Sequence, residues 1–110
     1  MIEAGSIIHG TMRREDLIPA FLDTLQDLAF SESKVESMAA REWNSIRGFM
    51  ESTEAFNADG SINEDWFDTE SADYTLEDLF DALDSIASCF DLTFGASEGD
   101  GSDYGFWSIA

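Results

Sequence analysis

Residues 75–109 read TLEDLFDALDSIASCFDLTFGASEGDGSDYGFWSI, and this stretch combines the two kinds of regular structure that we expect in the chain. Its first part, residues 75–90, repeats apolar side chains at spacings of three and four, which is the pattern of an amphipathic helix. Its second part holds two β-forming runs, residues 92–94 and 104–109, separated by glycines and acids that favour a turn. The stretch therefore predicts a helix that begins at Thr75, followed by a β-hairpin.

Two further amphipathic helices are expected before this stretch. Residues 13–29 carry an apolar stripe, and Pro19 is expected to disturb the helix that they form. Residues 34–52 carry a second stripe, which Ser33 and Glu36 open as a Ser-x-x-Glu capping box. The chain thus alternates helical segments with polar connections, and the hairpin comes last.

The remaining segments and the composition complete the expected fold. Ile7 and Ile8 suit either a brief strand or a packed N-terminal arm, whereas residues 53–74 carry loop signals. Hydrophobic residues make up 44% of the 110 positions, with nine Phe and three Trp, which is enough for one modest core. We predict a single acidic α+β domain over residues 1–110, with three amphipathic helices and a C-terminal β-hairpin.

Charge is distributed very unevenly along the chain. Residues 1–47 contain all five basic residues and eight of the 24 acids, a net charge of −3, and the other sixteen acids follow with no Lys or Arg. A surface of this kind repels nucleic acid and anionic membranes, and it attracts basic proteins. Because strongly basic cellular surfaces commonly hold DNA or RNA, we expect a basic nucleic-acid-binding protein as partner, and no direct binding of nucleic acid or membrane.

The expected compartment is the cytoplasm. The N-terminus lacks the basic region and apolar run of a signal peptide, and no stretch approaches the roughly 18 apolar residues of a membrane helix. The single cysteine, Cys89, excludes an internal disulfide and is expected to be a small core residue.

Catalytic residues are not indicated by any motif. His9 is the only histidine, and no signature around it or around Cys89 suggests a nucleophilic pair. Paired carboxylates occur in any chain this acidic and therefore discriminate nothing. No glycine-rich phosphate loop is present. We expect a protein without enzyme activity or cofactor.

Two loops contain oxygen-bearing side chains of the kind that bind metals. Residues 56–63 resemble the middle of a calcium-binding EF-hand loop when Gly60 is aligned with its invariant glycine. Ala55 and Trp66 then occupy the first and twelfth ligand positions, where both key oxygens are missing, so calcium should bind poorly if at all. The acidic turn 98–103 is interpreted as a solvated hairpin turn. We therefore predict no metal site.

The acids of the third helix and of the loop before it form the predicted partner-binding surface. Like charges on successive turns destabilise a helix by about 0.2–0.5 kcal/mol per pair. No cation offsets this cost here, so binding rather than stability is expected to shape the surface. The candidate partner-binding acids are Asp59, Glu64, Asp65, Asp68, Glu70, Asp73, Glu77, Asp78, Asp81 and Asp84.

Aromatic residues of the same region are candidate anchors for the contact. They are Trp66, Phe67, Tyr74 and Tyr104. We expect most of them in the core, but Trp66 and Phe67 lie inside an acidic loop and are the pair most readily placed at the surface. Trp66 therefore joins the candidate partner-binding residues.

Two segments resemble small acidic proteins carried by phages and plasmids. They are residues 10–21, GTMRREDLIPAF, and residues 94–107, FGASEGDGSDYGFW. The resemblance covers the two ends of the chain and implies a mobile-element origin, without any activity or site residues. In size, charge and lack of catalytic motifs the chain is also similar to anti-CRISPR and anti-restriction inhibitors that mimic DNA.

These observations favour one function and leave others open. The favoured function is a non-enzymatic inhibitor that occupies the DNA- or RNA-binding surface of a CRISPR effector or restriction enzyme by DNA mimicry, in the host cytoplasm if the gene is phage-borne. One alternative is an acidic adaptor or structural protein of a mobile element, and another is a halophilic domain whose charge serves solubility. The sequence is compatible with a monomer or a homodimer.

Overall fold

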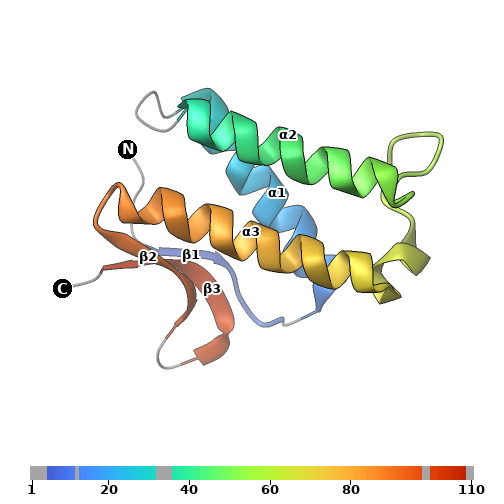
Figure 1. The fold of residues 1–110 in the computed structure, drawn as a ribbon. Helices are drawn as coiled ribbons and strands as arrows, with labels where there is room; N and C mark the ends of the chain where they lie inside the picture. Colours follow the sequence, from blue (N-terminus) through green and yellow to red (C-terminus); the bar gives the residue numbers. More distant parts are fainter. Residues whose placement is uncertain (1–4, 12, 32–35, 98–99, 109–110) are drawn as a thin grey trace.

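Three α-helices and a three-stranded antiparallel sheet form the fold over the residues that the computed structural model describes, 5–11, 13–31, 36–97 and 100–108 (Figure 1). The elements in chain order are β1 (Gly5–Ile8), α1 (Arg14–Ser31), α2 (Glu36–Ser52), the 3-10 helix η1 (Glu64–Asp68), α3 (Glu70–Ser88), β2 (Leu92–Ser97) and β3 (Asp100–Ser108). The predicted α+β class is confirmed, including the C-terminal hairpin of β2 and β3.

The sheet joins the two ends of the chain. Its strand order is β1-β3-β2, so β3 lies in the centre and pairs antiparallel with both neighbours. Ile7 and Ile8 therefore belong to a strand, which answers the question that the sequence left open. Gly105 pairs with Gly95 on one side and with Ser6 on the other.

Gly105 allows β1 to approach β3 closely. A Cβ atom at this position would contact the backbone oxygen of Gly5 and would lie 2.8 Å from the Cα atom of Ser6. Backbone atoms cannot swing aside as a flexible side chain can, so any larger residue would push β1 away from the sheet.

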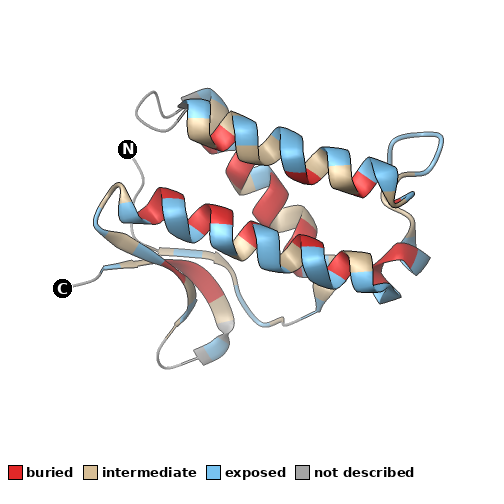
Figure 2. Cartoon of the chain, viewed as in Figure 1, coloured by how far each residue is buried: buried red, intermediate tan, exposed pale blue. Residues whose placement is uncertain are grey.

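An aromatic cluster joins the helices to the sheet. The ring of Phe21 in α1 packs edge-on against Phe80 of α3 at 5.3 Å, Phe94 of β2 at 5.1 Å and Tyr104 of β3 at 5.8 Å, measured between ring centroids. Edge-to-face pairs at these distances stabilise beyond the burial of their area. Buried residues accordingly line the sides of the helices that face one another (Figure 2).

The third helix begins five residues before the predicted start. Thr69 is its N-cap, and the Thr69 side chain accepts a hydrogen bond from the backbone N–H of Ala72. The expectation that Thr75 begins the helix is wrong. Thr75 is fully buried inside α3, and its hydroxyl donates to the carbonyl oxygen of Ser71 at 2.8 Å. A threonine that satisfies its hydroxyl on the preceding turn fits a helix interior as well as a cap.

The first two helices match their expected positions within a few residues. Pro19 lies inside α1 without ending it. The predicted capping box of α2 involves Ser33, which lies outside the described residues. None of the described helices combines the length and the apolar character needed to cross a membrane.

Candidate partner-binding surface

A stripe of carboxylates runs along the outer face of α3. Its members follow one another at spacings of three and four residues, which places them on one side of the helix. All are exposed, and they are Glu70, Asp73, Glu77, Asp81 and Asp84. Asp78, also exposed, borders the stripe. We call these six residues the α3 acidic face.

The α3 acidic face lies opposite the core side of the helix. The buried residues of α3 are Ala72, Thr75, Leu79, Ala82, Leu83, Ile86 and Ala87. At 100° per residue they point away from the carboxylate stripe, as Figure 2 shows along the length of α3. Packing of α3 against the rest of the fold therefore fixes the helix with its carboxylates directed to solvent.

The spacing of these charges approaches that of nucleic acid. Fifteen residues from Glu70 to Asp84 span about 21 Å of helix, so the five carboxylates of the stripe follow one another about every 5 Å. One DNA strand carries a phosphate about every 3.4 Å of helix axis. The stripe is thus a somewhat sparser row of negative charge than a single strand of a duplex.

The 3-10 helix η1 separates acids from aromatic residues in the preceding loop. Glu64, Asp65 and Asp68 are exposed, whereas Trp66 and Phe67 are only 3% and 6% exposed. The surface placement expected for Trp66 and Phe67 is therefore wrong. One tight turn directs the acids to solvent and the two rings inward, where they pack edge-on at 5.7 Å between ring centroids.

Tyr74, and not Trp66, is the exposed residue among the four candidate aromatic anchors. Its side chain is 56% exposed on the outer face of α3, whereas Tyr104 is 8% exposed in the core. The signal was present in the sequence, because Tyr74 lies three positions before Glu77 and four before Asp78, on the polar side of the helix.

The sequence suggested that no cation lies near the candidate acids. Two of these acids nevertheless lie beside an arginine. Arg14 of α1 binds Asp73 at 2.6 Å between Nη1 and Oδ1, and its Nη2 atom lies 4.0 Å from Asp68. Sequence reasoning missed this pair because 59 positions separate Arg14 from Asp73. Arg14 therefore neutralises part of the charge at the N-terminal end of the α3 acidic face.

Asp84 also holds the fold together. Its Oδ1 atom accepts a hydrogen bond from the backbone N–H of Phe94 at 3.1 Å, which ties the end of α3 to β2. A charge reversal at Asp84 would thus disturb the hairpin as well as the surface. Experiments on the charge of the face are better made at its other members.

Asp59 lies in a tight turn of the loop between α2 and η1. Its Oδ1 atom accepts hydrogen bonds from the hydroxyl of Ser61 at 2.6 Å and from the Ser61 backbone N–H at 3.0 Å. These bonds stabilise the charged carboxylate and lower the pKa of Asp59 below its ordinary value of 3.8. The hydrogen bonds of Ser61 therefore favour the charged form of Asp59. Asp59 itself lies before η1 in the chain and is not part of the α3 acidic face.

The other described cations lie mainly on α2. Arg47 stacks over Trp43, with 5.1 Å from its Cζ atom to the ring centroid, and over Phe56 at 4.5 Å. Its Nε atom is buried without a hydrogen-bond partner among the described residues. Arg47 therefore contacts the rest of the described chain by stacking on two aromatic rings.

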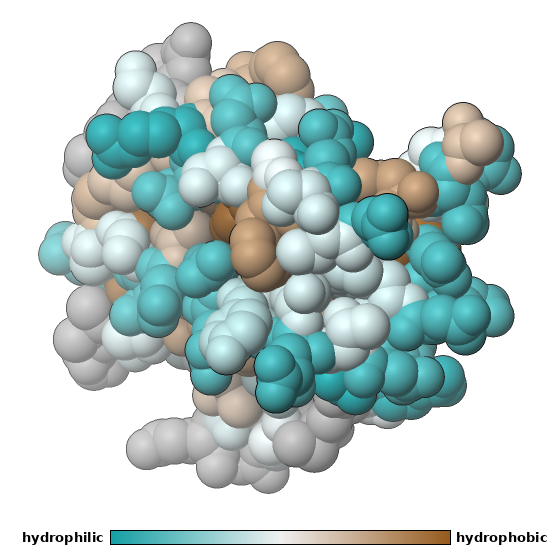
Figure 3. Space-filling view, turned by 45° about the vertical axis from the view of Figure 1, so that its right-hand side comes forward, coloured by the Kyte–Doolittle hydropathy of each residue, from teal (hydrophilic) through white to brown (hydrophobic). Residues whose placement is uncertain are grey.

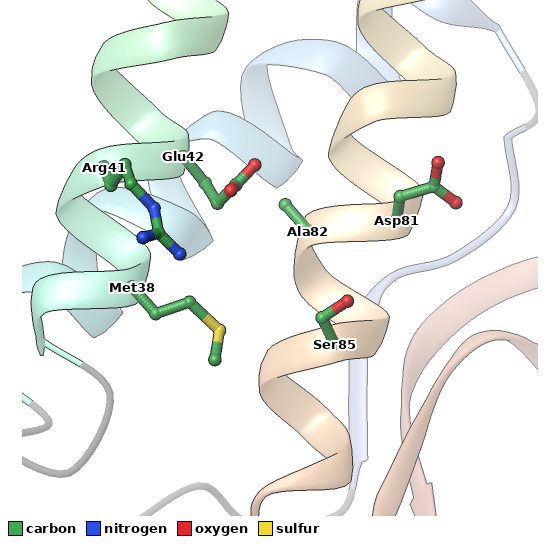
Figure 4. Close-up of a pocket in the computed structure, with 6 residues that line it drawn as sticks. All are labelled: Met38, Arg41, Glu42, Asp81, Ala82 and Ser85. Atoms are coloured by element: carbon green, nitrogen blue, oxygen red, sulfur yellow. The ribbon is translucent and has the colours of Figure 1, made fainter.

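A groove separates α2 from the outer face of α3. It has a volume of about 310 Å³ and is lined by Met38, Arg41, Glu42, Asp81, Ala82 and Ser85. Figure 4 shows the carboxyl group of Glu42 directed towards α3, with Ala82 facing it and Asp81 on the outer side of α3. The groove combines a positive and two negative side chains, so it offers no concentrated charge of one sign.

The two residues considered for catalysis lie at the ends of β1 and α3. His9 is exposed after β1, and the Cys89 thiol, half-buried at the end of α3, lies 3.7 Å from the carbonyl oxygen of Ser85. Across the described ranges, no group of three or more His, Cys, Asp or Glu side chains is placed to hold a metal ion. In the turn at 98–103, Glu98 and Gly99 lie outside the described residues.

Hydrophilic side chains cover most of the face shown in Figure 3, and only small hydrophobic areas interrupt them.

Comparison with protein-family models, curated proteins and solved structures found no match to this chain.

Proposed function

We propose that this protein is a non-enzymatic inhibitor that occupies the basic DNA- or RNA-binding surface of a host defence complex, a CRISPR effector or a restriction enzyme. The observation that carries the proposal is the α3 acidic face, a row of exposed carboxylates opposite the core side of one helix. A groove that neutralises phosphates with Lys and Arg would attract such a row in place of nucleic acid.

The physical basis of inhibition is competition for the same cations. Complementary charge accelerates encounter and orients the partners, while contacts between charged groups at the rim contribute little one by one. Several carboxylates must therefore act together. Arg14 reduces the charge near Asp73, so Glu70, Glu77, Asp78 and Asp81 are expected to contribute most.

The test replaces Glu70, Glu77, Asp78 and Asp81 together by Lys. A matched control replaces four exposed acids outside α3, Asp23, Glu51, Glu54 and Asp91, also by Lys. Each set reverses four charges and so changes the net charge from −19 to −11. The two variants thus differ in where the charge lies and not in how much there is.

Both variants and the wild type are used to capture proteins from cells that carry CRISPR and restriction systems, with washes at rising salt. Captured complexes are then assayed for DNA binding with and without each variant. We expect the wild type and the control to displace DNA and the α3 variant to fail. Displacement by all three alike would refute the proposal, and a captured partner that keeps its DNA would indicate an adaptor.

A further inference from the structure

Tyr74 interrupts the α3 acidic face with an aromatic ring. It is 56% exposed, whereas the other aromatic ring of α3, Phe80, packs into the core against Phe21 and Phe94. Among the described residues, Tyr74 makes no ring contact and its hydroxyl no hydrogen bond. Packing against the described residues therefore does not explain a tyrosine at this position.

Carboxylates surround the Tyr74 ring on neighbouring turns. Glu70 lies four positions before it, and Glu77 and Asp78 lie three and four positions after it, all of them exposed. Helix positions with these spacings have Cβ atoms about 5–6 Å apart. A cation that approaches the ring thus meets the π-face and carboxylate oxygens at the same time.

This combination suits arginine better than lysine. The planar guanidinium group can stack on a tyrosine ring and still direct its N–H groups at a carboxylate, whereas the ammonium group of lysine is a compact and strongly hydrated point charge. Tyrosine and arginine are also enriched among the residues that contribute most of the binding energy at protein interfaces.

We infer that the outer face of α3 selects an arginine-rich protein surface, with one arginine of the partner stacked on Tyr74 and bonded to the carboxylates around it. The inference deepens the proposed function and rests on it for the biological partner. Charge complementarity favours this occupant, because a second copy of the chain would itself carry a net charge of −19 and would be repelled.

The test compares oligo-arginine and oligo-lysine peptides of equal length as probes, using calorimetry on the full chain. Tyr74→Ala removes the ring, Tyr74→Phe keeps it, and Phe30→Ala removes an aromatic side chain of α1 that is 82% exposed outside α3. Circular dichroism confirms that each variant is folded before its binding is measured.

We expect the wild type to bind oligo-arginine more tightly than oligo-lysine. Tyr74→Ala should reduce this ratio of affinities by about two- to five-fold, whereas Tyr74→Phe and Phe30→Ala should leave it unchanged. Equal affinity of the wild type for both peptides, or an unchanged ratio in Tyr74→Ala, would overturn the inference. Failure of the proposed function is a separate result, because inhibition of DNA binding can be absent while the arginine preference stands.

Discussion

The indole N–H of Trp66 donates a hydrogen bond to the hydroxyl oxygen of Thr53, with 3.1 Å between the two atoms. This bond joins η1 to the turn after α2, and it satisfies the polar atom of a side chain that is only 3% exposed. Because its N–H group has an acceptor, Trp66 can be buried in an acidic loop without leaving an unsatisfied polar atom. The acids around Trp66 therefore lie on the surface above packed side chains.

The bond predicts a clear difference between two substitutions of Thr53. Thr53→Ala leaves the buried indole N–H without its acceptor and should lower the free energy of unfolding by about 1–3 kcal/mol. Thr53→Ser keeps the hydroxyl and should cost much less. Urea denaturation followed by tryptophan fluorescence measures both. Equal losses for Ala and Ser would show that the methyl group of Thr53, rather than the bond, matters.

Gly105 and Gly48 should respond in opposite directions to the same change. Gly105→Ala forces a Cβ atom against the backbone of Gly5 and Ser6 and should destabilise the protein by about 1–3 kcal/mol. Gly48 lies exposed inside α2, with no atom within 4 Å of an added Cβ, so Gly48→Ala should stabilise by about 0.5–1 kcal/mol. Thermal unfolding of both variants checks the pair, and a neutral Gly105→Ala would contradict the close approach of β1.

The fold was largely predictable because local patterns determine most of it. The spacing of apolar residues along α3 separates a core side from an acidic side without any knowledge of the other elements. The start of α3 was not predictable in the same way, since Thr69 and Thr75 are both acceptable caps by sequence and only the burial of Thr75 distinguishes them.

The parts of the site that depend on distant residues could not be derived from spacing. The bond from Arg14 to Asp73 arises only when α1 packs against α3, and the burial of Trp66 against Thr53 arises only when η1 packs against the turn after α2. The exposure of Tyr74 is an intermediate case. The polar side of the helix indicated it, but its aromatic character favoured the core, and the helical phase decided the outcome.

Asp84 should contribute to stability through its hydrogen bond to β2. Asp84→Ala removes the acceptor for the Phe94 backbone N–H and should lower the free energy of unfolding by about 1–2 kcal/mol. Asp84→Asn keeps an acceptor oxygen while removing the charge, so it should retain most of the stability. If Asp84→Asn were as unstable as Asp84→Ala, charge rather than the hydrogen bond would hold β2.

The pKa of Asp59 should depend on Ser61. The hydroxyl of Ser61 is the largest cause of the lowered pKa, so Ser61→Ala should raise the pKa of Asp59 towards 3.8. A lowered pKa in the folded state contributes stability above the unfolded pKa, and this contribution is lost as the pH falls through the folded value. Ser61→Ala should therefore lose less stability than the wild type on acidification. An NMR titration of the Asp59 carboxyl carbon measures the shift directly, and an unchanged value would contradict the turn geometry.

The α3 acidic face should cost the protein stability when no partner is bound. The wild type, with a net charge of −19, should unfold at a temperature several degrees higher at high salt, because the screening length falls from ~10 Å at ~0.1 M to ~3 Å at ~1 M ionic strength. The variant with Lys at positions 70, 77, 78 and 81 should be more stable than the wild type at low salt and gain less from added salt. Calorimetry of both proteins, together with the Lys control outside α3, makes the comparison.

The α3 variant should fold better and bind worse than the wild type if binding has shaped the α3 acidic face at the expense of stability. Functional sites commonly show this trade-off between stability and activity. A wild type that needs high salt to fold at all, with equal gains in both Lys variants, would instead favour a halophilic origin of the charge.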